Sequence, residues 1–230
     1  MQVTFNKSTQ IVYEVLDAIT HGIGLIASAI LGGFLISKGV STHLTGIQIA
    51  SLVVYVVSLL GLYLASTLFH CFVFTKASRV FQILDHSNIF LLIAGTYTPY
   101  CLIFINSPAG NWLLLTVWVL ALSGIALHIL SHGKHQKIET SIYVIMGWLC
   151  MFLAKNLYVS LDPTGFWLLV SGGNRIYSWR CNLQLSEVSR VTFDLALLCN
   201  GWHIVDVFVY LFKYLVIVVF YLNVIIINSE

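Results

Sequence analysis

Three side chains that could bind a metal or move a proton lie close together in the chain: Ser66, His70 and Asp85. Ser66 and His70 stand at positions i and i+4 near the end of one apolar run, so they share a face if the run is helical. Asp85 follows a short basic turn and begins the next apolar run, so two antiparallel helices would hold all three side chains at a similar depth. Ionisable groups at membrane depth are costly and usually mark a function, and an imidazole with a carboxylate and water suits zinc.

The composition identifies the chain as an integral membrane protein. Of its 230 residues, 59% are hydrophobic and only 9% are charged, whereas a soluble domain averages about 25% charged residues. The expected partners are membrane lipids, and a net charge of +2 gives no argument for nucleic acid. The five cysteines are scattered without a CxxC pair, which argues against a disulfide framework or a cysteine zinc site. The composition leaves the oligomeric state open.

Apolar runs long enough to cross about 30 Å of hydrocarbon recur along the chain, which predicts an all-α, polytopic bundle of membrane helices. The predicted spans cover residues 18–37, 46–69, 85–105, 111–130 and 140–157. Pro99 is expected to kink or end the third span. Glycines in the first span allow close helix packing, and they are Gly22, Gly24, Gly32 and Gly33.

The region after the fifth predicted span loses this regular pattern. A sixth span begins near Gly165 and then gives way to a polar, aperiodic stretch. A last apolar run over residues 204–227 contains Asp206 and Lys213, whose burial is unfavourable by roughly 2.5–3.5 kcal/mol each at the bilayer centre. This run is one possible further span.

The distribution of basic residues predicts a cytoplasmic N-terminus, because positive charge accumulates on the inner side of a membrane. With the N-terminus inside, the outer loops carry only Lys38 and Lys155. The inner segments then carry Lys7, Lys76, Arg79, Lys134, Lys137, Arg175, Arg180 and Arg190. Ser66, His70 and Asp85 should accordingly lie toward the cytoplasmic side.

Four separated motifs resemble the hemolysin III family, small seven-helix membrane proteins related to the progestin and adipoQ receptors. The motifs are EVLDAITHGIG, YLASTLFHCF, ILDHSNIFLLIAGTYTPY and IYVIMGWLCMF. The resemblance covers about residues 11–173. It implies a seven-helix bundle in a bacterial plasma membrane, and it divides the chain into a cytoplasmic arm over residues 1–17, a hemolysin-III-like bundle over 18–173 and an aberrant segment over 174–230.

The resemblance also implies an intramembrane zinc site. On this template His70 would be a zinc ligand, Asp85 would position or deprotonate water, and Ser66 would orient the site. Two further histidines, in an H-x-x-x-H motif on the seventh helix, would complete three imidazoles and an open water position, which is a catalytic arrangement. The adiponectin receptors resemble zinc-dependent hydrolases of ceramide-type amides, so a hydrolase of lipid amides or esters is expected. The alternative is a non-enzymatic cytolytic or membrane-homeostasis protein.

The sequence departs from this template after Gly173, where no H-x-x-x-H occurs. We hypothesise a frameshift from about Asn174 onward, because amino acids constrain their codons. Read from the second base of each codon, residues 179–183 permit Gly-Gly-Ala-Ile-Phe and residues 192–196 permit His-Ser-Ile-Trp-His. Residues 199–203 permit Val-Met-Ala-Gly-Thr, so one frame recovers three family-like segments in order. A sequencing error, a pseudogene and a genuine variant fit this pattern equally, and as written the activity would be impaired.

Each candidate also has a purely structural interpretation. His70 could be a helix-end histidine bonded to a carbonyl, Ser66 a serine bonded to its own helix, and Asp85 the N-cap of the third helix.

The remaining polar residues near the span ends have structural interpretations too. Glu14, Asp17 and His21 share a helical face and could simply be interfacial polar residues. His128, His132 and His135 flank a loop and are expected to be solvated.

Overall fold

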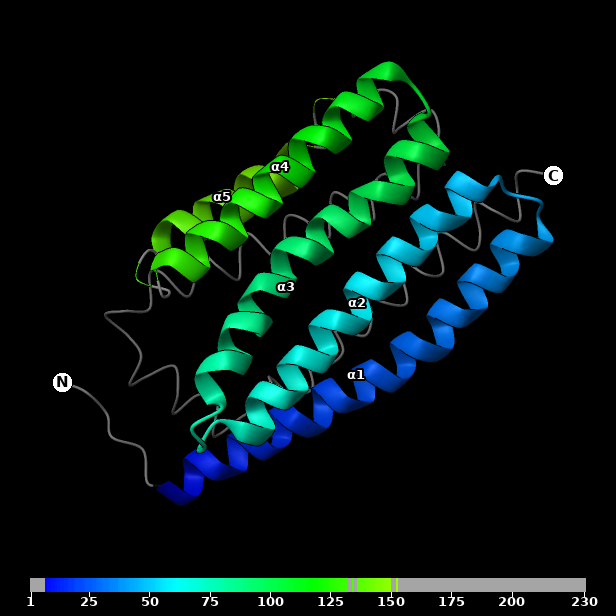
Figure 1. The fold of residues 1–230 in the computed structure, drawn as a ribbon. Coiled ribbons are helices and arrows are strands. Elements are labelled where there is room, and N and C mark those ends of the chain that lie inside the picture. Colours follow the sequence, from blue (N-terminus) through cyan, green and yellow to red (C-terminus); the bar gives the residue numbers. More distant parts are fainter. Residues whose placement is uncertain (1–6, 132–133, 135, 150–151, 153–230) are drawn as a thin grey trace.

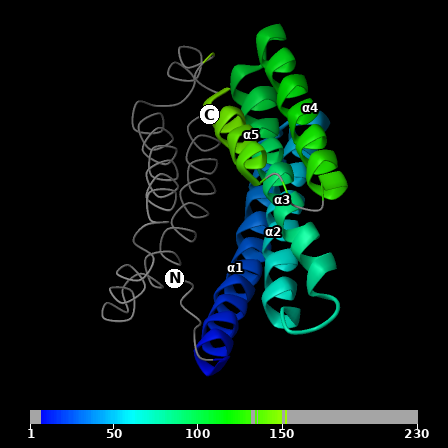
Figure 2. The ribbon, with the colours of Figure 1, turned by 90° about the vertical axis from the view of Figure 1, so that its left-hand side faces the viewer.

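The computed structural model describes residues 7–131, 134, 136–149 and 152, and in these ranges it contains helices and no strand. The elements are α1 (Lys7–Ser41), α2 (Gly46–Phe72), α3 (Ser78–Pro99), a π-helix (Tyr100–Ile105), α4 (Pro108–Ser131) and α5 (Gln136–Trp148). Successive helices run antiparallel and lie side by side from α1 to α4 (Figure 1). Helix α5 packs on both α3 and α4 (Figure 2). The all-α prediction is confirmed.

Four of these helices are long and apolar enough to cross a membrane. They cover Gln10–Ser41, Gly46–Phe72, Ser78–Ile105 and Pro108–Ser131, and about 20 apolar residues suffice for one crossing. Large apolar side chains on their outer faces are exposed, as lipid contact requires: Ile30 is 68% and Leu130 is 80% exposed. The prediction of a polytopic helical membrane protein is confirmed for this part of the chain. The predicted sixth span and the run over 204–227 lie outside the described residues.

Close packing of α1 on α2 depends on two of the predicted glycines. A Cβ added to Gly24 would meet the ring of Tyr63, and one added to Gly32 would meet Val56, each at 2.5 Å. Gly33 faces open space instead. Gly24 and Gly32 therefore let the two backbones approach closely along one face of α1. This close approach fixes the register of the α1 side chains relative to α2.

Pro99 ends α3 as an α-helix, which confirms the sequence prediction. The chain continues through the π-helix, in which the N–H of Asn106 donates to the carbonyl of Cys101 at 3.0 Å. Asn106 then adopts a left-handed conformation, with φ 35°. This irregular stretch lies at the end of the bundle opposite the α2–α3 turn (Figure 1), so it does not disturb the polar residues described next.

The start of α1, the end of α2 and the start of α3 meet at one end of the bundle (Figure 1). Helix α3 begins at Ser78 with Ala77 at its N-cap position, about two turns before Asp85. The interpretation of Asp85 as an N-cap is therefore wrong. Residues 78–84 are helical, so the helix starts before the apolar run does.

Candidate functional site

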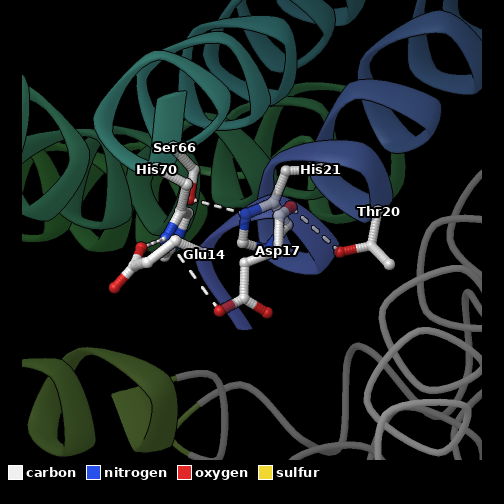
Figure 3. A network of polar contacts seen from close by, with 6 residues as sticks. All are labelled: Glu14, Asp17, Thr20, His21, Ser66 and His70. Carbon is white, nitrogen blue, oxygen red and sulfur yellow. Dashed lines mark hydrogen bonds and ion pairs between the residues drawn. The ribbon is translucent and has the colours of Figure 1, made fainter. Parts of the chain in front are cut away.

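A network of polar side chains joins the start of α1 to the end of α2 (Figure 3). Glu14, Asp17 and His21 recur at helical spacing on α1 and point toward α2, where Ser66 and His70 face them. The rings of His21 and His70 are 5.3 Å apart between centroids. The α1 residues are thus paired with the predicted site residues, and they are more than isolated interfacial groups.

The imidazole of His70 is held by a carboxylate from the neighbouring helix. Its Nδ1 lies 2.7 Å from Oε2 of Glu14 and 4.0 Å from Oδ2 of Asp17. The side chains of His70 and Glu14 are 16% and 28% exposed, so the pair is partly accessible. Nδ1 therefore has a carboxylate partner, contrary to the interpretation in which His70 bonds a backbone carbonyl.

Ser66 links His21 on α1 to Asp85 on α3. Its Oγ lies 2.8 Å from Nδ1 of His21, and its side chain also interacts electrostatically with Asp85. A hydroxyl has one proton to donate and a carboxylate only accepts. His21 Nδ1–H can therefore donate to Ser66 and leave the hydroxyl proton for Asp85.

The three residues singled out in the sequence are thus brought together. Asp85 interacts electrostatically with His70 as well as with Ser66. We call the group Glu14, Asp17, His21, Ser66, His70 and Asp85 the α1–α3 cluster. Sequence reasoning placed Glu14 and His21 on one helical face, but it could not show that this face meets His70.

A second polar group, which we call the α3–α5 cluster, consists of His86, His128 and Glu139. Nδ1 of His128 lies 3.0 Å from Oε2 of Glu139, and these side chains are only 6% and 4% exposed. The rings of His86 and His128 are 5.2 Å apart between centroids. The ion pair lacks hydrogen-bond alignment, and Oε1 of Glu139 has no partner among the residues described.

The prediction that His128 is solvated is wrong. Helix α4 continues to Ser131, and His128 lies on its buried face together with Val117, Ala121 and Gly124. That spacing, at i, i+4, i+7 and i+11, was the signal in the sequence that could have shown its burial. His132 and His135 lie outside the described residues.

The residues present fit one part of a zinc site. His70 offers an imidazole oriented by a carboxylate, which is the usual surrounding of a zinc-bound histidine, and Asp85 and Ser66 lie next to it. Across residues 7–131 and 136–149, no group of three or more His, Cys, Asp or Glu side chains is arranged to hold a metal ion. Further ligands would have to come from other parts of the chain. Cys71 and Cys101 are free thiols.

Comparison with known proteins identifies the family. The family described as "Haemolysin-III related" matches residues 9–178. Hemolysin-3 of Bacillus cereus is 45% identical over 168 residues, which are 73% of this chain and 76% of that protein. The Hemolysin-3 homolog of Bacillus subtilis (strain 168) is 42% identical over 160 residues, 70% of this chain and 75% of that protein. No solved structure matches the chain.

These matches and the membrane-spanning helices define a polytopic helical membrane protein. The chain belongs to the hemolysin III family. The family match ends at residue 178, close to residue 174, where the regular sequence pattern is lost.

Proposed function

We propose that this chain derives from a zinc-dependent hydrolase of lipid amides or esters and is impaired in that activity as written. The observation that supports this most is the pairing of His70 with Glu14 beside the Ser66–Asp85 contact. An imidazole with a carboxylate on Nδ1 has its other ring nitrogen available for a metal. A carboxylate next to such a metal can accept a proton from water.

Zinc, when bound, would lower the pKa of a water molecule to about 7 and polarise a carbonyl. The chain's own residues would do the rest. His70 would hold the metal through Nε2, Asp85 would orient the water and take its proton, and Ser66 would keep the carboxylate in place. His21, which contacts Ser66 at 2.8 Å, would hold that hydroxyl in turn.

A lipid is the expected substrate because of where the cluster lies. The α1–α3 cluster lies within about three turns of the ends of membrane-spanning helices, at one end of the bundle (Figure 1). Amide and ester carbonyls of membrane lipids lie at the boundary between headgroups and acyl chains. A site at this depth could therefore reach a carbonyl while the acyl chain stays in the bilayer. The N-terminus would be cytoplasmic, in a bacterial plasma membrane.

Impairment follows from the missing imidazoles. The sequence contains no H-x-x-x-H after Gly173, so one described histidine ligand stands where a catalytic zinc usually has three protein ligands. We propose that the frame changes near Asn174 and that the other frame supplies both histidines. Zinc binding by the chain as written would then be weak.

The test is the zinc content and lipid hydrolysis of the purified protein, in the written frame and in the restored frame. We expect stoichiometric zinc and hydrolysis of a ceramide-type amide or an ester only in the restored frame, and loss of both in His70→Ala. His43→Ala is the matched control, because His43 is exposed in the α1–α2 loop. A restored protein without zinc, whose activity is unchanged by His70→Ala, would overturn the proposal.

A cytolytic or membrane-homeostasis role without catalysis is the second candidate. It is favoured by the incomplete ligand set and by the names of the two relatives, Hemolysin-3 and Hemolysin-3 homolog. Leakage of dye from liposomes would test it. Leakage that persists with a chelator and in His70→Ala would support the cytolytic role, whereas no leakage at any protein-to-lipid ratio would exclude that role.

A further inference from the structure

We propose that Glu14 is the positioning residue of the site: it fixes His70 as the Nδ1–H tautomer and leaves Nε2 as the ring nitrogen open to a metal. The claim that Nε2 binds a metal rests on the proposed function. The claim that Glu14 fixes the tautomer of His70 stands without it. The proposal is based on the distance of 2.7 Å between Nδ1 of His70 and Oε2 of Glu14.

The tautomer follows from the chemistry of the two groups. An ionised carboxylate has no proton to donate, so the short contact requires the proton on Nδ1 of the imidazole. In the neutral ring the lone pair is then on Nε2. Metal-bound histidines almost always donate their other ring N–H to a carboxylate, a carbonyl or water, and losing that partner typically lowers metal affinity 10- to 100-fold.

Asp17 cannot replace Glu14 as the hydrogen-bond partner of His70, although it lies one turn further along α1. Its Oδ2 is 4.0 Å from Nδ1 of His70, and its side chain is 51% exposed. That distance is too long for a hydrogen bond. Asp17 therefore adds negative charge near the ring without fixing its proton, which makes it a matched control on the same helical face.

The helix packing gives Glu14 a fixed position. Gly24 and Gly32 bring the α1 backbone close to Tyr63 and Val56 on α2. The contact between His21 and Ser66 joins the same two helices at 2.8 Å. A side chain held by such supporting contacts is oriented before any ligand arrives. This gives a role to the glutamate of the EVLDAITHGIG motif, which sequence reasoning could not derive.

The experiment measures the tautomer directly, in the zinc-free protein. ¹⁵N-histidine NMR in detergent distinguishes the two neutral tautomers, and His70→Ala assigns the His70 signals. We expect the Nδ1–H form in the unsubstituted protein and in Asp17→Asn. In Glu14→Ala we expect a mixture of tautomers. Glu14→Gln keeps an oxygen acceptor, so it should retain more of the Nδ1–H form than Glu14→Ala does.

Zinc titration of the same proteins in the restored frame tests whether the orientation of His70 by Glu14 matters for metal binding. Glu14→Ala should weaken zinc binding about 10- to 100-fold, and Asp17→Asn should change it much less. An Nε2–H tautomer in the unsubstituted protein, or a tautomer unaffected by Glu14→Ala, would overturn the proposal. Equal effects of Glu14→Ala and Asp17→Asn would overturn it too. If no protein binds zinc, the proposed function fails, and the NMR result still decides the role of Glu14.

Discussion

Among the described residues, two imidazole–carboxylate contacts of 3.0 Å or less lie at the same end of the bundle, and they differ in burial. His70 and Glu14 lie 2.7 Å apart and are partly exposed. His128 and Glu139 lie 3.0 Å apart and are almost completely buried. Both histidines stand in the last turn of their helices, where the helix dipole favours a positive charge. The same chemical pair therefore occurs once in an accessible setting and once in a sealed one.

The difference separates a site from a structural contact. The accessible pair belongs to a network that reaches Asp85 through Ser66, so its geometry could serve a ligand. The sealed pair ties α4 to α5, and His86 packs against it from α3. Burial makes the sealed pair dependent on both partners, because a lone buried charge is strongly destabilising. Accessibility makes the first pair less important for stability and more useful for chemistry.

The largest expected effect comes from supplying the missing histidines. Restoring the frame near Asn174 should raise bound zinc from little to about one equivalent, since three imidazoles make a common zinc site. Elemental analysis of the purified protein measures this. In the restored protein, His43→Ala should leave the zinc content unchanged, because His43 is exposed in the α1–α2 loop. Sequencing of the gene across codons 170–210 shows whether a single-base change produces that frame.

The next effect concerns stability and the sealed pair. Glu139→Ala should destabilise the protein by about 3–5 kcal/mol, because it leaves one member of a buried pair alone. Glu14→Ala should cost about 0–1 kcal/mol, as expected for a more exposed pair. Unfolding in detergent, followed by circular dichroism, measures both.

A double variant checks the reason for that difference. Replacing both partners, in His128→Leu with Glu139→Leu, should recover most of the loss, because an apolar pair carries no desolvation penalty. Equal losses in Glu139→Ala and Glu14→Ala would contradict the contrast between the two pairs.

A smaller effect is expected where α1 packs on α2 and carries the accessible pair. Gly32→Ala should destabilise by about 1–3 kcal/mol, because the added Cβ overlaps Val56. Gly33→Ala is the matched control: its Cβ meets nothing within 4 Å, and alanine favours a helix by about 0.5–1 kcal/mol over glycine. The same unfolding measurement distinguishes them. A loss of stability in Gly33→Ala as large as that in Gly32→Ala would argue against close packing of α1 on α2 at Gly32.

The smallest expected effect is a difference in chemical reactivity between the two histidines. Diethylpyrocarbonate reacts with accessible imidazole nitrogens, so His70 should be modified faster than His128. Mass spectrometry of peptides from the intact, detergent-solubilised protein gives both rates, with exposed His43 as the internal reference. Comparable rates for His70 and His128 would show that the second pair is not sealed.

The sequence predicted the fold class and the meeting of Ser66, His70 and Asp85, because both follow from local patterns. Apolar runs indicate membrane helices, and residues on either side of a tight turn come together when the helices are antiparallel. Pro99 likewise marked the end of α3 through its own ring and its missing N–H.

The partners of these residues could not be predicted in the same way. Glu14 meets His70 because two helix faces pack in a particular register, and that register is set by Gly24 and Gly32. His128 was wrongly assigned to solvent, since a polar residue next to a loop resembles one in the loop. Asp85 was considered as an N-cap because hydropathy changes there, whereas α3 begins earlier, at Ser78. Helix boundaries and apolar boundaries need not coincide.

The order of the helices along the chain determines which parts of the α1–α3 cluster are synthesised first. Every member of the α1–α3 cluster precedes His86, so these residues leave the ribosome before α4 is made. The contacts described among them lie within residues 14–85. On the proposed frame change, a gene that loses its late histidines would still encode these helices and the contact between His70 and Glu14. Under the proposed function, loss of catalysis and loss of the protein would then be separate events, on which selection could act independently.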